Sequence, residues 1–231
     1  MRRLVQFVVI VMAGFMLAQA QTSFVIDRVI AVVNNTPVLQ SDWETMLRFE
    51  ALMNGRTAES FTEEERRSVF ARLIDQELIR QQMKTATVPS VSEADVDARV
   101  REVRAQIPTA SNDATWKELL QRMGISQGEV RDRLRSQMEI LRYLDDQFRP
   151  LARVDFRAIT RYYREQYLPA LKKQGAEEVP LTQVVDKIHE ILVQQRIDEQ
   201  INNWLQTLRE GAAITIPKPF GNEPIETSAT K

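Results

Sequence analysis

The sequence has no cysteine and a single histidine among its 231 residues. Without cysteine the protein has neither disulfide bonds nor thiol chemistry, so its stability has to come from packing. The single histidine, His189, excludes the common zinc motifs, which combine histidine with a second histidine or with cysteines at fixed spacing. We therefore expect no metal site, and we interpret His189 as a structural or surface residue.

Glycine is also scarce, with seven residues in the whole chain. None of them forms a dinucleotide-binding G-x-G-x-x-G, a P-loop or a G-x-S-x-G nucleophile motif. The paired carboxylates Asp145-Asp146 and Glu177-Glu178 are sequence neighbours, which point in different directions on a helix. The sequence therefore predicts no cofactor and no catalytic residue.

The chain has no excess charge of one sign, since its formal net charge is −1. Its arginine-rich stretch alternates with acids and so does not predict a phosphate-binding stripe; the arginines are Arg131, Arg133, Arg135 and Arg142. A nucleic-acid-binding protein usually has a one-sided basic excess, so we expect no nucleic-acid partner.

The first 20 residues are typical of a signal peptide. Met1-Arg2-Arg3 is basic, Leu4 to Leu17 is apolar, and Ala18-Gln19-Ala20 is a small-residue cleavage site. An uncleaved anchor is the alternative, but the apolar run is shorter than the roughly 20 residues of a spanning helix. We expect residues 1–20 to be removed on export.

β-prone sequence is limited to the two ends of the remaining chain. Val29 to Val33 is β-branched, and Asn34-Asn35 after it suits a tight hairpin turn leading to a short edge strand at Val38-Leu39. The other β-prone segment is Ala213 to Ile216. Because a lone hairpin is marginally stable, we predict that both ends join in one small sheet.

The rest of the chain has helical spacing of apolar residues, which predicts a mainly α fold of several helices. Capping boxes are expected at Ser41/Glu44, Thr62/Glu65 and Ser126/Glu129.

We expect a helical domain over residues 21–168, followed by a break at Pro169 and a polar linker over 169–179. A final helix of roughly 30 residues should begin near Pro180 and complete the core with its strand over 180–216. The tail, 217–231, has no periodicity and is predicted to be disordered.

Methionines and large aromatics are the candidates for an adaptable binding surface. The helix after Ser41 carries Met46, Phe49 and Met53 on more than one face, which is compatible with burial on two sides or with a soft groove. The full candidate set is Met46, Phe49, Met53, Phe61, Trp116, Met123 and Met138, and each of these residues can equally belong to the core.

The order of these elements resembles the SurA family of periplasmic chaperones. The segment from Asp27 to Asp42 is similar to the family's opening, and Val91 to Val96, Trp116 to Leu120 and Tyr162-Tyr163 follow in the family's order. The stretch from Gln194 to Ile216 resembles the family's C-terminal helix and strand. The resemblance implies a periplasmic core module that binds unfolded outer-membrane proteins.

The sequence departs from the family where parvulin-type prolyl isomerase domains normally follow Tyr-Tyr. Only Arg164 to Val179 stands there, whereas a small domain needs roughly 50 residues. The resemblance therefore implies an ATP-independent holdase for unfolded exported chains. Two alternatives are a structural or adaptor protein that uses the same surface for a fixed partner or a homodimer, and, less favoured, a degenerate prolyl isomerase.

Overall fold

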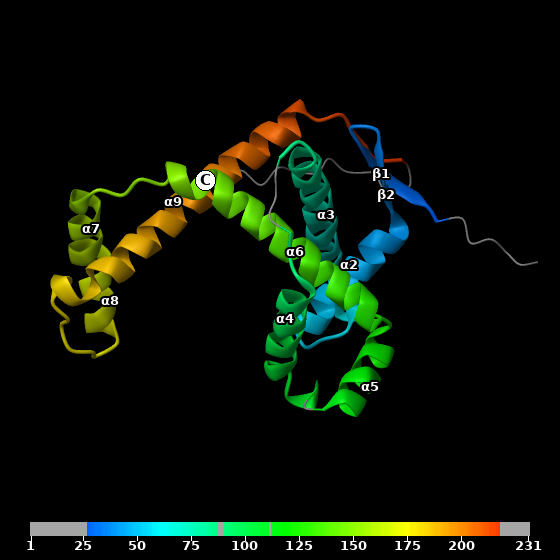
Figure 1. Ribbon diagram of the computed structural model, residues 1–231, viewed down its shortest axis with the longest axis horizontal. Coiled ribbons are helices and arrows are strands. Elements are labelled where there is room, and N and C mark those ends of the chain that lie inside the picture. The colour runs from blue at the N-terminus through cyan, green and yellow to red at the C-terminus, as the bar shows by residue number, and fades with distance from the viewer. Residues whose placement is uncertain (1–26, 87–89, 111, 218–231) are drawn as a thin grey trace, which may run out of the picture.

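The computed structural model describes residues 27–86, 90–110 and 112–217. The predicted signal peptide and nearly all of the predicted tail lie outside these residues. In the described part, helices dominate and one small sheet lies at one end (Figure 1). This is the mainly α fold that the periodicity predicts.

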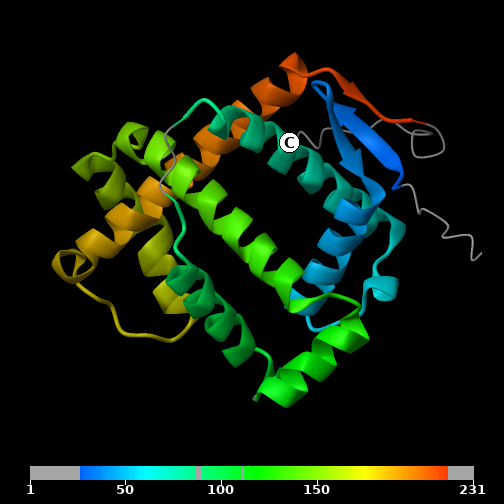
Figure 2. The same ribbon diagram turned by 45° about the vertical axis from the view of Figure 1, so that its right-hand side comes forward.

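The sheet is formed by both ends of the described chain. Its antiparallel strands lie in the order β2-β1-β3, with bounds β1 Val29–Val33, β2 Thr36–Leu39 and β3 Ile214–Thr215. Val32 is paired with Thr215 in the β1–β3 ladder, and Figure 2 shows β3 beside the hairpin. The predicted joining of the two ends is confirmed.

The hairpin turn has the backbone that its two asparagines predict. Asn34 and Asn35 have φ angles of 48° and 70°, the left-handed region that a two-residue hairpin turn requires. Asn34 also holds the segment that leads into β3, since its Oδ1 accepts a hydrogen bond from the Ala213 amide at 2.8 Å. The turn therefore fixes both the hairpin and the return of the C-terminal strand.

Five helices follow the hairpin and form the main body. Their bounds are α2 Gln40–Met53, α3 Glu63–Met83, α4 Glu93–Ala105, α5 Asp113–Met123 and α6 Gln127–Phe148. Short 3₁₀ turns lie at Ala58–Ser60, Pro108–Ala110 and Arg149–Leu151 (η1, η2 and η3).

Two of the three predicted capping boxes are present. The Thr62 amide donates to Glu65 and the Glu65 amide donates back to the Thr62 hydroxyl, at 2.7 and 3.2 Å. Ser126 and Glu129 exchange the same pair of bonds at 2.7 and 3.1 Å. Each box satisfies amides that the first turn of a helix leaves without partners, which is why α3 and α6 begin where they do.

The third predicted box is wrong by two residues, because α2 begins earlier. Leu39 is the cap residue, and its amide donates to the Asp42 carboxylate at 3.3 Å. The Ser41 hydroxyl donates instead to Asp27, which lowers the pKa of that carboxyl. Glu44 accepts a bond from Arg48 within the helix.

The remaining helices form a second lobe and the connection to it. They are α7 Phe156–Tyr162, the π-helical turn η4 Tyr163–Tyr167, α8 Leu168–Lys173 and α9 Leu181–Gly211. The predicted break at Pro169 does not occur, because the chain stays helical through Lys173. Pro169 lies in the first turn of α8, where a missing amide is tolerated, directly after the π-helical turn.

Helix α9 joins the two lobes. Its 31 residues span about 46 Å. Val184 and Ile188 pack with Ile159 in the second lobe, whereas Trp204 packs with Tyr143 of α6 in the body. The helix therefore carries its own apolar residues from one hydrophobic cluster into the next.

Candidate functional site

The structure places most of the seven candidate residues in the core. Four side chains are buried: Met46, Phe49, Phe61 and Trp116. Met123 and Met138 are half-buried, and Met53 is 38% exposed. A groove lined by Met46, Phe49 and Phe61 is therefore not present in this conformation, and the alternative of burial on two sides describes α2.

The burial of α2 has a simple physical cause. Met46 packs in one hydrophobic cluster with the hairpin and α3, while Phe49 packs in another with α4, α5 and α6. Phe49 comes three positions after Met46, which places the two side chains about 60° apart around the helix axis, on adjoining faces. A helix with partners on both sides buries more than one apolar stripe, as the sequence of α2 indicates.

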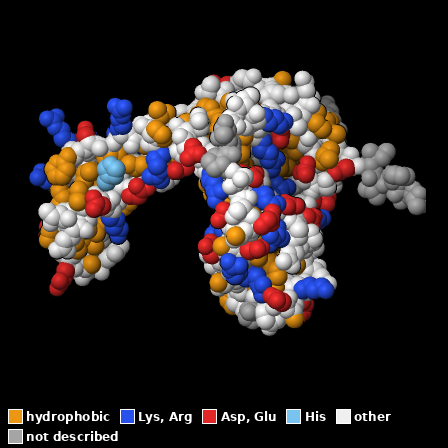
Figure 3. Space-filling view, viewed as in Figure 1, with side chains coloured by type: hydrophobic (Ala, Val, Ile, Leu, Met, Phe, Trp, Pro, Cys, Tyr) orange, Lys and Arg blue, Asp and Glu red, His pale blue; other side chains and the backbone are white. Residues whose placement is uncertain are grey.

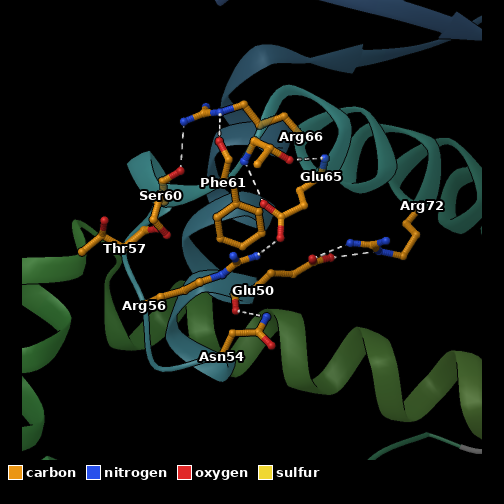
Figure 4. A network of polar contacts seen from close by, with 11 residues as sticks. Glu50, Asn54, Arg56, Thr57, Ser60, Phe61, Glu65, Arg66 and Arg72 are labelled. Carbon is orange, nitrogen blue, oxygen red and sulfur yellow. Dashed lines mark hydrogen bonds and ion pairs between the residues drawn. The ribbon is translucent and has the colours of Figure 1, made fainter.

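Phe61 is held from several directions in the connection between α2 and α3. Figure 4 shows the Arg56 guanidinium beside the Phe61 ring, with the Arg56 carbon at 3.9 Å from the ring centre. Arg66 donates to the Phe61 carbonyl at 3.2 Å, and Arg56 pairs with Glu65 at 2.6 Å. These contacts assign Phe61 a structural role, closing the corner where α3 begins.

The space-filling view shows a deep hollow between the two lobes (Figure 3). Comparison with the ribbon places α7, α8 and the start of α9 on one side, and α4 and α5 on the other (Figure 1). Helices α6 and α9 bridge the hollow and contact each other. The molecule is therefore an arch, with apolar side chains visible across the face of the second lobe that Figure 3 presents.

Leu141 is the exposed continuation of the apolar stripe on α6. Val130 and Leu134 in this stripe are buried against α4 and α5. Leu141 follows Leu134 by about two turns, so it lies on the same face. Its side chain is 65% exposed where α6 continues toward the second lobe. Met138, one turn earlier, is half-buried, so the stripe becomes accessible along this part of α6.

Two further exposed apolar side chains lie on the way into the second lobe. Leu151 of η3 is 63% exposed and Phe156, at the start of α7, is 65% exposed. Large apolar residues with this exposure are informative when several occur on one connected region. Sequence periodicity does not identify them, because it indicates which residues share a face but not where the covering helix ends.

The second lobe is fixed by its tyrosines. The Tyr163 hydroxyl donates to the Val179 carbonyl at 2.8 Å, which ties the loop before α9 to the π-helical turn. Tyr163 and Tyr167 stack with ring centres 6.1 Å apart. The lobe has its own small cluster around Ile159 and Ile188. It is therefore a small packed unit linked to the body through α9 and the connection after α6.

Charged residues bind α4 to α6 beside the hollow. Arg131 donates to Asp97 and to Glu93, which raises the pKa of the guanidinium. Arg142 donates to Asp95 at 3.0 Å and lowers the pKa of that carboxyl. The pairs are largely exposed and each contributes little to stability. They tie α4 to α6 through arginines that alternate with acids along the sequence of α6.

Other kinds of site find little support in the described ranges. Among these residues, no group of three or more histidine, aspartate or glutamate side chains has the geometry to hold a metal ion. His189 is exposed on α9. None of the described helices is both long and apolar enough to cross a membrane.

The fold defines a class of protein: a mainly helical module whose two ends meet in a three-stranded sheet. The family model for the SurA-like N-terminal domain matches residues 2–144. This match covers more than half of the sequence, and the chain belongs to the SurA-like N-terminal domain family. The matched region ends within α6, so the second lobe and α9 lie beyond it.

One match among solved structures comes from work on two proteins of Campylobacter jejuni. That work describes the virulence factor PEB4 and the periplasmic protein Cj1289 as structurally related SurA-like chaperones. The match has 12% sequence identity and a TM-score of 0.48, and covers 82% of this chain and 99% of the other. No curated protein matches this sequence.

Proposed function

We propose that this protein is an ATP-independent periplasmic chaperone that holds unfolded exported polypeptides, including outer-membrane proteins, in the hollow of the arch. The observation that carries the proposal is the 65% exposure of Leu141 on α6, the helix that bridges the hollow and is ion-paired with α4. Membership of the SurA-like family supports the same function. The signal-like sequence at residues 1–20 supports export to the periplasm.

The surface suits transient binding of many chains. Leu141, Leu151 and Phe156 offer apolar area without forming a closed pocket. A client segment can bury its own aromatic or aliphatic side chains there, gaining about 25 cal/mol for each Å² of apolar surface removed from water. Charged residues around the stripe limit permanent association. The proposal includes no nucleotide and no chemical step, so binding and release follow the folding of the client.

The test is suppression of aggregation. An unfolded outer-membrane barrel protein is diluted from denaturant into buffer with or without the mature chain, and light scattering is followed without ATP. We expect suppression near equimolar ratio. The double variant Leu141→Glu/Phe156→Glu should require severalfold more protein, because each charge opposes burial of an apolar client.

The matched control is Val29→Glu. Val29 is 38% exposed on β1, at the opposite end of the molecule from the second lobe (Figure 1). The substitution introduces a charge at an exposed apolar position away from the hollow. The Val29→Glu variant should therefore suppress aggregation as well as the wild type does. Equal loss in control and double variant would contradict a role for the hollow.

The same protein samples test the alternatives. A concentration-dependent dimer in sedimentation velocity that Leu141→Glu/Phe156→Glu dissociates would favour a fixed interface over client binding. Acceleration of prolyl isomerisation in a peptide substrate would support the degenerate isomerase, and we expect none. Failure of the folded wild-type chain to suppress aggregation would refute the holdase function.

A further inference from the structure

A polar cavity lies on the body, where β2, α2, α3 and α6 meet. Its volume is about 420 Å³, within the range of small-ligand sites. Leu73 and Val38 are apolar residues of its lining, and Thr45 and Ser136 are polar ones. Arg80 and Arg133 line the same cavity. The cavity is separate from the exposed stripe around Leu141, which does not line it.

Arg133 has an unusual environment for a cation. Its one hydrogen bond within the described ranges goes from a guanidinium nitrogen to the Asp42 backbone carbonyl, at 2.7 Å. No described carboxylate forms an ion pair with it, whereas its helix neighbour Arg135 pairs with both Glu93 and Asp132. Burial, followed by repulsion from Arg80, lowers the pKa of Arg133. An arginine stays charged in spite of such a shift in its pKa. Arg133 is therefore a partly buried positive group whose guanidinium has further N–H groups that can donate hydrogen bonds.

None of the carboxylates that line the cavity bonds to the Arg133 side chain within the described residues, although Asp42 and Glu129 lie close enough to favour its charged form. Each of these acids has other partners. These partners are the Leu39 amide for Asp42, the Ser126 amide for Glu129, Arg135 for Asp132, and Gln81 and Arg80 for Glu77. Each carboxylate keeps lone pairs that can accept further hydrogen bonds.

This arrangement discriminates between kinds of anion. A phosphate dianion would meet four nearby carboxylates, and like charges at short range raise the free energy of binding. The same four carboxylates oppose a single ligand carboxylate less strongly, because it brings less charge, and a carboxylate can form a two-point contact with a guanidinium. If that carboxylate belongs to a polypeptide, the backbone amides beside it match the remaining acceptors on the cavity wall. The mixed lining therefore favours a peptide carboxylate over an inorganic anion.

We propose that the cavity binds a carboxylate of the client polypeptide, held by Arg133 with Arg80 beside it. The inference rests on the proposed chaperone function and adds a polar anchor to the apolar stripe. Such an anchor would fix one point of an extended client while the stripe accepts its apolar residues. The carboxylate has two possible sources in a polypeptide, the chain terminus and an acidic side chain.

The experiment compares peptides that differ only in these carboxylates. A labelled, aromatic-rich peptide is prepared with a free C-terminal carboxylate, with a C-terminal amide, and as the amide with one internal glutamate or glutamine. Binding to the mature chain is measured by fluorescence anisotropy. We expect the free acid to bind about tenfold more tightly than the amide, in line with a charge-assisted hydrogen bond. Rescue of the amide by glutamate but not glutamine would assign the side-chain source.

Arg133→Gln should remove the preference for the acid, and Arg135→Gln is the matched control. Arg135 lies on the same helix with its own acidic partners, so its variant should keep the tenfold difference. Thermal unfolding shows whether each variant is folded. The comparison of peptides on the wild-type chain needs no variant, so it decides the question even if Arg133→Gln unfolds.

Two negative results are distinguishable. Equal binding of acid, amide and glutamate peptides to the wild-type chain would overturn the carboxylate site and leave the chaperone function standing. Absence of binding by every peptide to the folded chain would overturn both proposals.

Discussion

Replacing Phe49 by alanine separates a core residue from a client-binding residue. The Phe49 side chain is 2% exposed, and it packs with Leu52, Val96, Trp116 and others in the cluster between α2, α4, α5 and α6. Truncation removes most of a buried aromatic ring and leaves a cavity that its neighbours fill only in part. Substitutions of this kind cost about 3–5 kcal/mol. For a domain of this size that loss corresponds to a fall in melting temperature of about 10 °C.

Met53→Ala is the control in the same helix. Met53 lies about one turn after Phe49 and is 38% exposed, so its truncation should cost less than about 1 kcal/mol. The free energy of unfolding is measured for both variants by urea titration with circular dichroism. Equal m-values are needed, since these indicate that the same surface is exposed on unfolding. Equal costs for the two variants, or a cost below about 1 kcal/mol for Phe49→Ala, would refute the assignment of Phe49 to the core.

Three further predictions concern the turn, the C-terminal closure and pH. Asn35→Gly should raise the melting temperature by about 2 °C, because glycine adopts φ near 70° without strain; a fall would contradict this reading of the turn. Arg209→Ala should cost about 2–3 kcal/mol in urea unfolding, because Arg209 donates twice to Asp75, at 2.6 and 2.5 Å, and joins α9 to α3; an Asp75→Ala/Arg209→Ala double variant should lose little more. Asp95→Asn should be less stable than the wild type at neutral pH, because Arg142 lowers the folded pKa of Asp95. A carboxyl whose pKa is lowered by folding contributes stability above its unfolded pKa, and this stability is lost as the pH falls through the folded pKa. The difference in stability between Asp95→Asn and the wild type should therefore close in unfolding curves measured at acid pH. A difference that stayed constant with pH would refute the pairing.

The hairpin and the starts of α3 and α6 can be predicted because their signals are local. Asn34-Asn35 after a β-branched run predicts a hairpin, and a capping box such as Thr62/Glu65 requires only four residues. The pairing of β3 with β1 is a long-range contact, yet scarcity of other β-prone sequence made it the natural partner. The start of α2 was misplaced because the Ser41 hydroxyl binds Asp27, a partner from outside the helix.

The candidate surface was harder to predict, since its location depends on where one helix stops covering another. Val130, Leu134 and Leu141 share one stripe of α6, and nothing in that periodicity distinguishes the buried pair from the exposed third residue. Composition pointed to methionines and aromatics, but Phe49 and Trp116 are the residues that a small helical core needs most. The sequence does not distinguish Arg133 from the other arginines of the same stretch, because all of them alternate with acids. The lack of an acidic partner for Arg133 becomes visible only when the opposing helices are in place.

The arch also explains why the two ends of the chain need to meet. Helix α9 carries the second lobe, and its last turns pack against the body through Trp204 and Leu208 before β3 joins β1. Loosening this end, by Arg209→Ala for example, would weaken the attachment of α9 that sets the position of the second lobe relative to Leu141. If the hollow holds the client, such a variant should lose holding activity while its hairpin and α4–α6 contacts remain intact. If clients bind only at the exposed residues of a single lobe, it should lose stability but not holding. Measuring aggregation suppression for Arg209→Ala at a temperature where the chain remains folded therefore tests whether the arch acts as one binding unit.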